Sequence, residues 1–202
     1  ARNQISTFYF AGSRTEEVNP VGSAKVLYFN RFGKEVRIIN SLGKVVRKYY
    51  DNFNRIIEVV APEGNKIQWT YDKNNNALTQ TFVAKPGSGL SNIQYVRAYD
   101  PVWAKISSTT DGAGNVNSYS YDAFTGDLIS ASGPVVGGSS PIYSYAYNAR
   151  GQVVTVADPT GVVSRFNYDI STEKLTSVVQ DYNVSLGHLN LTTSIGYDSV
   201  GN

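Results

Sequence analysis

Residues 147–169 read YNARGQVVTVADPTGVVSRFNYD, and this stretch decides the fold. It holds one turn at 147–151, an apolar and β-branched run at 152–157, and a second turn at 158–161. Short Asx side chains accept bonds from backbone N–H groups two residues on, and glycine closes such turns at positive φ. After Val162 the side chains alternate between two faces, with Phe166 and Tyr168 on the same side. The stretch therefore predicts an antiparallel hairpin and the opening of its next copy.

The same unit recurs along the chain at Tyr followed by Asp or Asn. Counted from Phe29, which stands where later copies have Tyr, the intervals are 21, 21, 28, 22, 26, 21 and 29 residues. A sharp lower limit with occasional extra residues is expected of a two-strand unit with variable loops. The extra residues fall at 85–89, 133–141 and 181–189. The repeat-turn residues are Tyr50, Asp51, Tyr71, Asp72, Tyr99, Asp100, Tyr121, Asp122, Gly126, Tyr147, Asn148, Gly151, Tyr168, Asp169, Tyr197 and Asp198.

The strands that end in the repeat tyrosines have two different faces. In residues 66–71, Ile67, Trp69 and Tyr71 alternate with Lys66, Gln68 and Thr70. Stacked hairpins would gather aromatic and aliphatic side chains on one face of a sheet and small polar groups on the other. No helical period is present, so the sequence predicts an all-β protein. We expect a repeat sheet over 25–202 and an irregular segment over 1–24, with room for one or two strands, one at 6–10 and a loop at 11–21.

The composition excludes several function classes. With 18 Lys and Arg against 16 Asp and Glu, the charge does not favour nucleic acid. There is no cysteine for a disulfide or a metal site, and no apolar run of the length that spans a membrane. The absence of methionine and the end of the chain inside a repeat turn indicate a piece of a longer protein.

No catalytic, metal-binding or cofactor-binding group is predicted. His188 is the only histidine and lies in a polar loop, where we expect it to be exposed. The repeat aspartates could be imagined as paired acids for glycoside hydrolysis, but an Asx-turn role explains their position more simply. Trp103 and Tyr182 are the candidates for stacking against a ligand. The prediction is therefore a protein that is not an enzyme and needs no cofactor.

The unit Tyr-Asp-x-x-Gly, followed by a short apolar strand and an Asp-Pro-x-Gly turn, resembles the YD repeat of the RHS family. That family includes bacterial polymorphic toxins, the C component of insecticidal toxin complexes, and the teneurins. Some copies depart from the pattern. Asn54 and Asn75 replace glycine, which Asn tolerates because it reaches positive φ readily. Trp103 occupies the glycine position after Tyr99 and Asp100, and Glu173 matches the position of Gly126.

The resemblance implies tandem β-hairpins in a curved or spiralling sheet that forms part of a β-shell. The implied role is a wall that encapsulates a toxin or presents it at the cell surface, in a secreted or surface protein. Its partners would be the remainder of the same polypeptide, including further repeats and a C-terminal toxin cargo. The alternative is an adhesion module that binds glycans or a surface protein. A propeller of four-stranded blades is a second architecture, although seven units give an incomplete ring.

Overall fold

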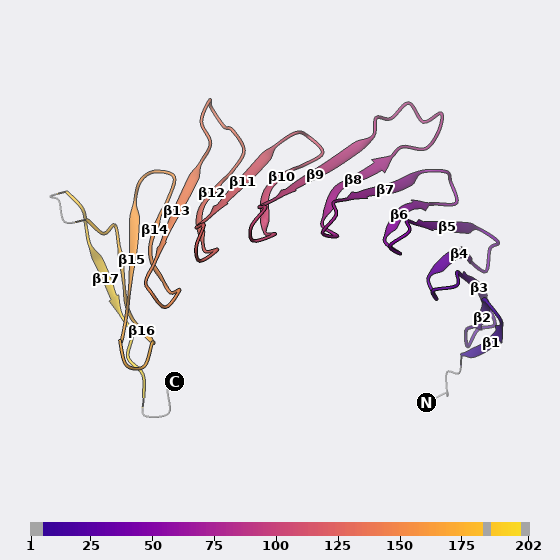
Figure 1. Ribbon diagram of the computed structural model, residues 1–202, viewed down its shortest axis with the longest axis horizontal. Coiled ribbons are helices and arrows are strands. Elements are labelled where there is room, and N and C mark those ends of the chain that lie inside the picture. Colours follow the sequence, from indigo (N-terminus) through magenta and orange to yellow (C-terminus); the bar gives the residue numbers. More distant parts are fainter. Residues whose placement is uncertain (1–5, 184–186, 199–202) are drawn as a thin grey trace. The chain divides into compact units, whose positions relative to one another are not determined.

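The computed structural model describes residues 6–183 and 187–198, which hold 17 β-strands and no helix. The chain divides into two compact units, residues 1–96 and 97–202. The boundary falls inside one strand, β9 (Ile93–Tyr99). In each unit every strand pairs antiparallel with the strand that follows it in the chain (Figure 1). The predicted all-β fold of tandem hairpins is therefore confirmed.

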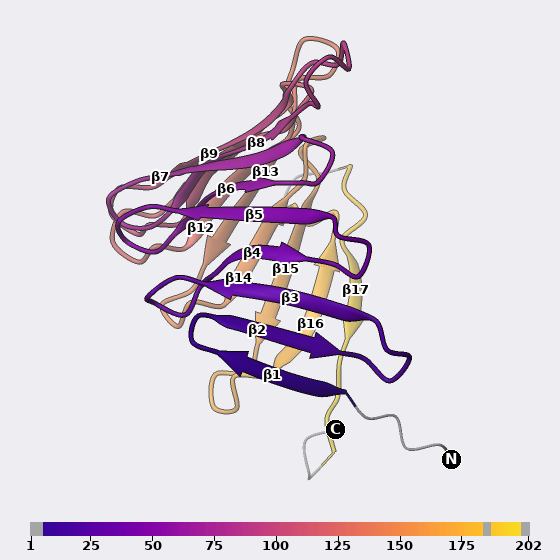
Figure 2. The same ribbon diagram turned by 90° about the vertical axis from the view of Figure 1, so that its right-hand side faces the viewer.

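The first unit contains eight complete strands and the start of β9. Figure 2 shows its first strands side by side, alternating in direction. The strands are β1 (Thr7–Ala11), β2 (Arg14–Val18), β3 (Ala24–Phe29), β4 (Glu35–Ile39), β5 (Val45–Tyr50), β6 (Ile56–Val60), β7 (Lys66–Tyr71) and β8 (Ala77–Val83).

The second unit repeats the same hairpin pattern. Its strands after β9 are β10 (Ile106–Thr110), β11 (Val116–Tyr121), β12 (Leu128–Ser132), β13 (Ile142–Tyr147), β14 (Val153–Ala157), β15 (Val163–Tyr168), β16 (Leu175–Gln180) and β17 (Leu191–Ser194).

Turns of two kinds alternate along each unit, and they lie at opposite ends of the strands. We call the end with the Tyr-Asx turns the YD edge and the other end the loop edge. The YD edge holds turns 30–34, 51–55 and 72–76 in the first unit and 100–105, 122–127, 148–152 and 169–174 in the second. The long connections 84–92, 133–141 and 181–190 all belong to the loop edge of their unit. The large variations in repeat length therefore lie at the loop edge, whereas turns of the YD edge differ by one residue.

The strand register separates two faces, as the alternation predicted. Tyr119 lies opposite Ala131, which lies opposite Tyr143, and these residues belong to the apolar face of the second unit. One residue further along, Ser120 pairs with Ser130 on the polar face. In the first unit the cross-strand row Val59, Ile67 and Phe82 is apolar, and the row Glu58, Gln68 and Thr81 is polar.

Each unit is a single layer of sheet, so the core is thin. Among the described residues Leu27 is the only buried hydrophobic side chain, with 7% of its surface exposed. The other apolar side chains are covered partly by their neighbours in the same layer. Stability in such a sheet comes from contacts between successive hairpins more than from a central core.

The N-terminal segment differs from one sequence expectation. The loop expected at 11–21 is wrong over Arg14–Val18, which forms β2 and pairs with both β1 and β3. Its sequence RTEEV carries charged or polar groups on both faces, so it lacks the alternation that signals a strand. Backbone hydrogen bonds to the strands on both sides stabilise β2, although its own sequence does not favour a strand.

Candidate functional site: the Tyr-Asx turns

Most short turns are built around one Asx side chain, and the turn 61–65, which begins at Ala61, closes through backbone bonds. In the turn after Tyr50, Asp51 Oδ1 accepts the backbone N–H groups of Phe53 and Arg55, both at 2.9 Å. The backbone closes around the same residue, since the N–H of Asn54 donates to the carbonyl of Asp51 at 3.0 Å. The same arrangement is found at Asn19, Asn30, Asn40, Asp72, Asp111, Asn148 and Asp158.

Three turns of the YD edge are one residue longer. Asp122 Oδ1 accepts the N–H groups of Phe124 and Thr125, and the Asp122 N–H donates to the carbonyl of Asp127, five residues on. Asp100 and Asp169 do the same. The residues at positive φ in these turns are Ala104 (52°), Gly126 (75°) and Glu173 (61°).

This geometry corrects the assignment of Trp103 to the glycine position. The left-handed residue is Ala104, because the turn that begins at Asp100 is the longer one. Asn54 and Asn75, by contrast, have φ of 58° and 68° at the position where most copies have glycine. The turn expected after Tyr197 begins at Asp198, and residues 199–201 lie outside the described part of the chain.

The repeat tyrosines join neighbouring strands through their hydroxyl groups, and all of them except Tyr197 are the last residue of a strand. Tyr121 ends β11, and its hydroxyl donates to the carbonyl of Ile106, the first residue of β10, at 2.7 Å. Six repeat tyrosines make the equivalent bond at 2.7–3.0 Å. The pairs are Tyr50 to Glu35, Tyr71 to Ile56, Tyr121 to Ile106, Tyr147 to Leu128, Tyr168 to Val153 and Tyr197 to Leu175. Tyr99 ends β9.

Five of the six accepting carbonyls, those of Glu35, Ile56, Leu128, Val153 and Leu175, belong to residues at β-bulges. At Tyr147 the register shifts by one residue, and Tyr147 lies opposite Val153. Val153 is also the residue whose carbonyl accepts the hydroxyl of the next repeat tyrosine, Tyr168. A bulge disturbs the ladder of backbone bonds. The tyrosine hydroxyl of one repeat therefore satisfies a carbonyl at the bulge left by the previous repeat.

Side chains at the ends of the turns link neighbouring turns along the YD edge. Lys105 donates to the carbonyl of Gly126 at 2.6 Å, and the Trp103 indole N–H donates to the carbonyl of Asp122 at 3.1 Å. Arg55 donates to the carbonyl of Asp72 at 2.9 Å. Gln152 reaches the carbonyl of Glu173 at 2.9 Å. The sequence analysis did not predict these links. The feature that could have indicated them is the long polar side chain at the last position of the turn.

The carboxylates of the turns are held in their charged form. The N–H group of Thr172 and the hydroxyl groups of Ser171 and Thr172 all donate to Asp169, which lowers the pKa of Asp169 from 3.8 to about 2. The pKa of Asp122 is lowered by the N–H groups of Thr125 and Phe124. The carboxylates of Asp122 and Asp169 are therefore hydrogen-bonded within their own turns.

The remaining candidate residues are engaged in local contacts. The Trp103 ring packs against Gly126, where an added Cβ would lie 2.7 Å from Trp103 Cδ2. The Tyr182 hydroxyl accepts a bond from Arg165 at 2.7 Å, and the Arg165 guanidinium lies 4.9 Å from the centre of the Tyr182 ring. His188 Nδ1 lies 2.6 Å from Asp181 Oδ1. Each of these side chains is used within the sheet or its loops.

The described ranges 6–183 and 187–198 contain no group of three or more His, Cys, Asp or Glu side chains placed to hold a metal ion. Within the same ranges no helix has the length and hydrophobicity of a membrane span.

Comparison with solved structures identifies the fold. The chain aligns over 94% of its length with 12% of a chain in the crystal structure of TcdB2-TccC3, with a TM-score of 0.54 and 16% identity. It aligns over 98% of its length with 16% of a chain in TcdB2-TccC3 without its hypervariable C-terminal region, with a TM-score of 0.52 and 12% identity. It aligns over 98% of its length with 14% of a chain in the crystal structure of TcdB2-TccC3-Cdc42, with a TM-score of 0.51 and 13% identity.

The chain spans between an eighth and a sixth of the length of these toxin-complex chains. No protein-family model and no curated protein sequence matches it. At this level of identity the likeness establishes the fold, which is that of an RHS-repeat sheet, as the resemblance of the YD turns implied.

Proposed function

Given a fold shared with the RHS-repeat chains of the TcdB2-TccC3 complexes, we propose that this chain is a non-enzymatic wall segment of a β-shell. The shell would enclose a toxin or present it at the cell surface, and the rest of the same secreted or surface polypeptide would supply the further repeats and the cargo. The observation that carries the proposal is the row of tyrosine hydroxyl bonds, which joins strands at regular intervals within each unit.

The chemistry of the turns supports a mechanical role. Carboxylates such as Asp51 and Asp169 accept bonds from their own backbone, so they are committed to closing turns. The single-layer sheet has two large faces and a thin core, which suits a partition between two spaces better than a compact catalytic domain.

The proposal is tested by weakening the wall in the full polypeptide and measuring protection of the cargo from protease. The variant Tyr121→Phe/Tyr147→Phe/Tyr168→Phe removes three hydroxyl bonds to backbone carbonyls. The control Tyr119→Phe/Tyr143→Phe/Tyr145→Phe removes three hydroxyls that make no hydrogen bond with the described residues.

For a wall that encloses a cargo, we expect the first variant to expose the cargo to protease at a lower temperature than the parent protein and the control. Equal sensitivity of the cargo in all three proteins, while the sheet itself is destabilised, would refute an enclosing role. Trp103, the stacking candidate of the adhesion alternative, packs against Gly126 and remains 37% exposed.

A further inference from the structure

In three turns of the YD edge the last residue is a cation that lies over the ring of the next repeat tyrosine. A cation is attracted to the face of an aromatic ring within about 6 Å of its centre. Measured from the charged group to the ring centre, the pairs are Arg55 with Tyr71 at 4.7 Å, Lys105 with Tyr121 at 5.4 Å and Lys174 with Tyr197 at 4.7 Å.

Asp127 holds the same position in its own turn, 122–127, with the opposite charge. The last residues of the other described turns of this edge are Lys34, Arg55, Asn76, Lys105, Gln152 and Lys174. The Asp127 carboxylate makes no hydrogen bond or ion pair with the described residues. The pKa of Tyr147 is raised by burial and, next, by the negative charge of Asp127, so the carboxylate acts on the following repeat tyrosine.

The turn after Asp127 also lacks a side-chain donor that another turn receives. Arg55 donates to the carbonyl of Asp72, the first residue of the next turn, at 2.9 Å. The equivalent carbonyl of the turn 148–152 is that of Asn148, which accepts no side-chain bond from the described residues. Nor does a described cationic or aromatic side chain lie over the Tyr147 ring. We call the Asp127 carboxylate, the Tyr147 ring and the Asn148 carbonyl the Asp127 site.

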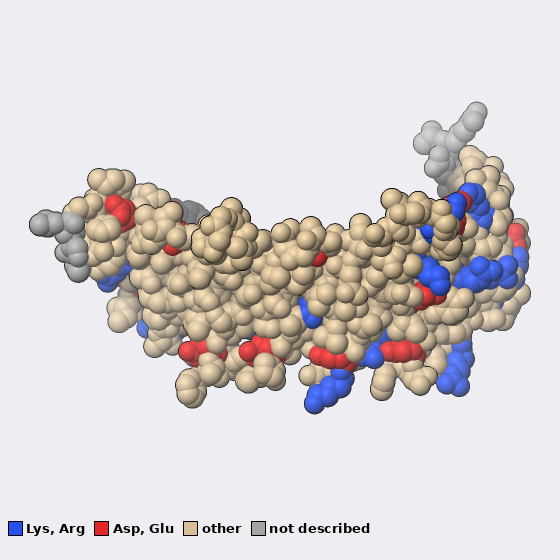
Figure 3. All heavy atoms as spheres, turned by 90° about the horizontal axis from the view of Figure 1, so that it is seen from above, with Lys and Arg blue, Asp and Glu red and all other residues tan. Residues whose placement is uncertain are grey.

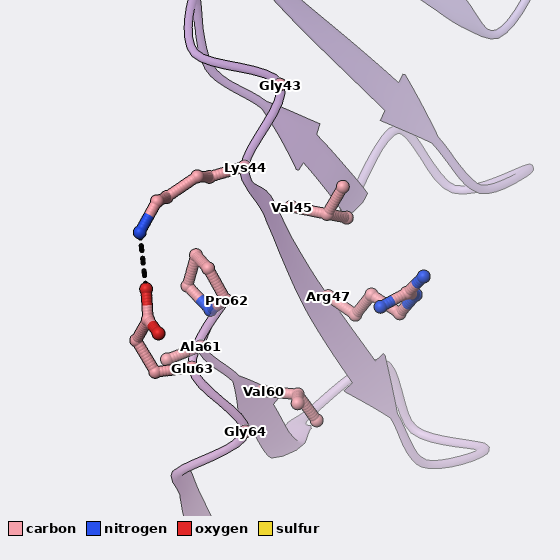
Figure 4. Close-up of a pocket in the computed structure, with 9 residues that line it drawn as sticks. All are labelled: Gly43, Lys44, Val45, Arg47, Val60, Ala61, Pro62, Glu63 and Gly64. Carbon is pink, nitrogen blue, oxygen red and sulfur yellow. Dashed lines mark hydrogen bonds and ion pairs between the residues drawn. The ribbon is translucent and has the colours of Figure 1, made fainter.

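Elsewhere the chain bridges the hollows between its neighbouring turns with its own side chains. At the loop edge of the first unit, Lys44 and Glu63 form an ion pair at 2.5 Å across such a hollow (Figure 4). At the YD edge of the second unit, Arg150 lines another hollow and donates to the carbonyl of Ile170 at 2.6 Å. No equivalent bridge extends from Asp127 to a described residue of the next turn.

The second unit has few cations, and most of them are engaged. Residues 97–202 hold 5 Lys and Arg against 9 Asp and Glu, a net charge of −4, whereas residues 1–96 hold 13 against 7, a net charge of +6. Figure 3 shows Lys and Arg gathered over the first unit. Arg97 lies on β9, three strands or roughly 14 Å from β12, which follows Asp127. The other four contact neighbouring groups, and they are Lys105, Arg150, Arg165 and Lys174.

We propose that the Asp127 site binds an arginine side chain of another polypeptide segment. A guanidinium is planar, stacks on aromatic rings and donates N–H bonds in fixed directions, so one group can contact the ring, the carboxylate and the carbonyl together. It would occupy the place that Arg55 takes between Tyr71 and Asp72. The site lies at the YD edge and uses neither face of the sheet.

The residue beside the site indicates the kind of segment that fits. Phe124, in the same turn as Asp127, is 92% exposed. An exposed aromatic ring next to an unpaired carboxylate favours a peptide with an apolar residue beside its arginine over a small free cation. This inference goes beyond the proposed wall function and does not depend on it.

The test titrates the 202-residue chain with a blocked Gly-Leu-Arg-Leu-Gly peptide and follows backbone and tyrosine-ring signals by NMR. We expect shifts at residue 127 and at 147–151. Citrulline in place of arginine keeps the shape without the charge, so binding should weaken at least fivefold. Asp127→Asn should weaken it as much. The matched control Glu173→Gln removes a carboxylate from the same edge, and we expect a change of less than twofold.

A second variant tests whether the site is the one that other turns fill themselves. Asp127→Arg places the chain's own guanidinium beside the Tyr147 ring, so we expect peptide binding to be lost, with thermal unfolding as the check that each variant is folded. Retained binding in Asp127→Arg, equal affinities of Asp127→Asn and Glu173→Gln, or equal binding of the citrulline peptide would each overturn the proposal. So would the absence of binding, or spermidine binding as tightly at the same residues.

Discussion

Glycine in a turn is usually needed for its backbone, and at Gly126 a neighbouring side chain adds a second requirement. Its φ of 75° lies in the left-handed region, and the Trp103 ring occupies the space that a Cβ would fill. Gly151, at φ 76°, is the left-handed residue of the next turn along the YD edge and has no atom within 4 Å of an added Cβ. An added side chain would cause backbone strain at both glycines but a steric clash only at Gly126. Comparing the two positions therefore distinguishes the two effects.

We expect Gly151→Ala to lower the free energy of unfolding by about 1 kcal/mol, the cost of a left-handed alanine. Gly126→Ala should cost roughly 2–4 kcal/mol, because the Trp103 ring must move and its indole N–H then loses the carbonyl of Asp122. Urea denaturation of both variants measures the difference. In the Trp103→Ala background the two alanine substitutions should cost the same, and a persistent gap would refute the steric explanation.

The turn carboxylates make stability depend on acid. The pKa of Asp169 is lowered from 3.8 to about 2 in the folded chain, so its charged form is favoured by folding. Its contribution is complete above about pH 4 and is lost as the pH falls from 4 towards 2. The pKa values of Asp51, Asp72, Asp111, Asp122, Asp158 and Asp181 are also lowered.

We expect Asp169→Asn to destabilise the chain at pH 7 and to make little difference at pH 2. The amide keeps the oxygen acceptor that Asn148 uses in its own turn, but it carries no charge. Urea denaturation of parent and variant at the two pH values measures the change. An equal loss of stability at both would show that charge on Asp169 contributes nothing to folding.

The sequence predicts which turn residue adopts positive φ only where that residue is of a type that favours this conformation, such as glycine or asparagine. Asn54 and Asn75 were predicted to adopt positive φ because the asparagine side chain tolerates it, and they do. Ala104 gave no such signal, and its φ of 52° depends on a turn one residue longer than expected. The stacking of Trp103 on Gly126 joins residues in successive turns, so no local pattern could reveal it.

At the scale of an element, the hairpin is closed at both ends by different means. A five-residue Asx turn closes β10 and β11 at the loop edge, and the Tyr121 hydroxyl closes them at the YD edge. The same bond joins Tyr147 to Leu128 across the longer connection 133–141. The tyrosine bond does not depend on the length of the connection. It can therefore hold the two strands in register even where the connection between them is long.

We expect Tyr121→Phe to lower the free energy of unfolding by roughly 0.5–1.5 kcal/mol, because the Ile106 carbonyl loses its side-chain donor. Tyr119→Phe is the control, since its hydroxyl makes no hydrogen bond with the described residues. Denaturation curves and amide exchange at the start of β10 measure the effect. Equal stabilities of the two variants would mean that the hydroxyl bond adds nothing.

At the scale of the molecule, each unit depends on its neighbouring hairpins because a single layer has no second sheet to pack against. The sequence predicted the strands from β3 to β16 well, since each repeat carries its own turn signals. It did not predict β2, whose polar sequence forms a strand only because β1 and β3 pair with it. Nor does a balanced overall charge disclose that cations and anions are divided between the two units.

The edge strand β1 should drive self-association of the isolated chain. Phe8, Tyr9 and Phe10 are 52%, 57% and 78% exposed, and among the described residues β1 contacts only β2. Exposed edges pair with other strands, and lysine on an edge opposes this. Phe10→Lys should therefore shift the chain towards monomer in analytical ultracentrifugation. The control Phe32→Lys changes an exposed side chain of a turn, and an equal shift there would argue against edge pairing.

The spacing between strands does not depend on the lengths of the connections, which differ by one residue at the YD edge and by several residues at the loop edge. Connections 133–141 and 181–190 are separated by two hairpins, or roughly 19 Å at the usual strand spacing, whatever their own lengths. A guest peptide inserted in either connection would leave that interval unchanged. The repeat thus provides a scaffold that would display inserted sequences at distances set by the strand spacing. The tyrosine hydroxyl bonds hold the strands together at regular intervals along it.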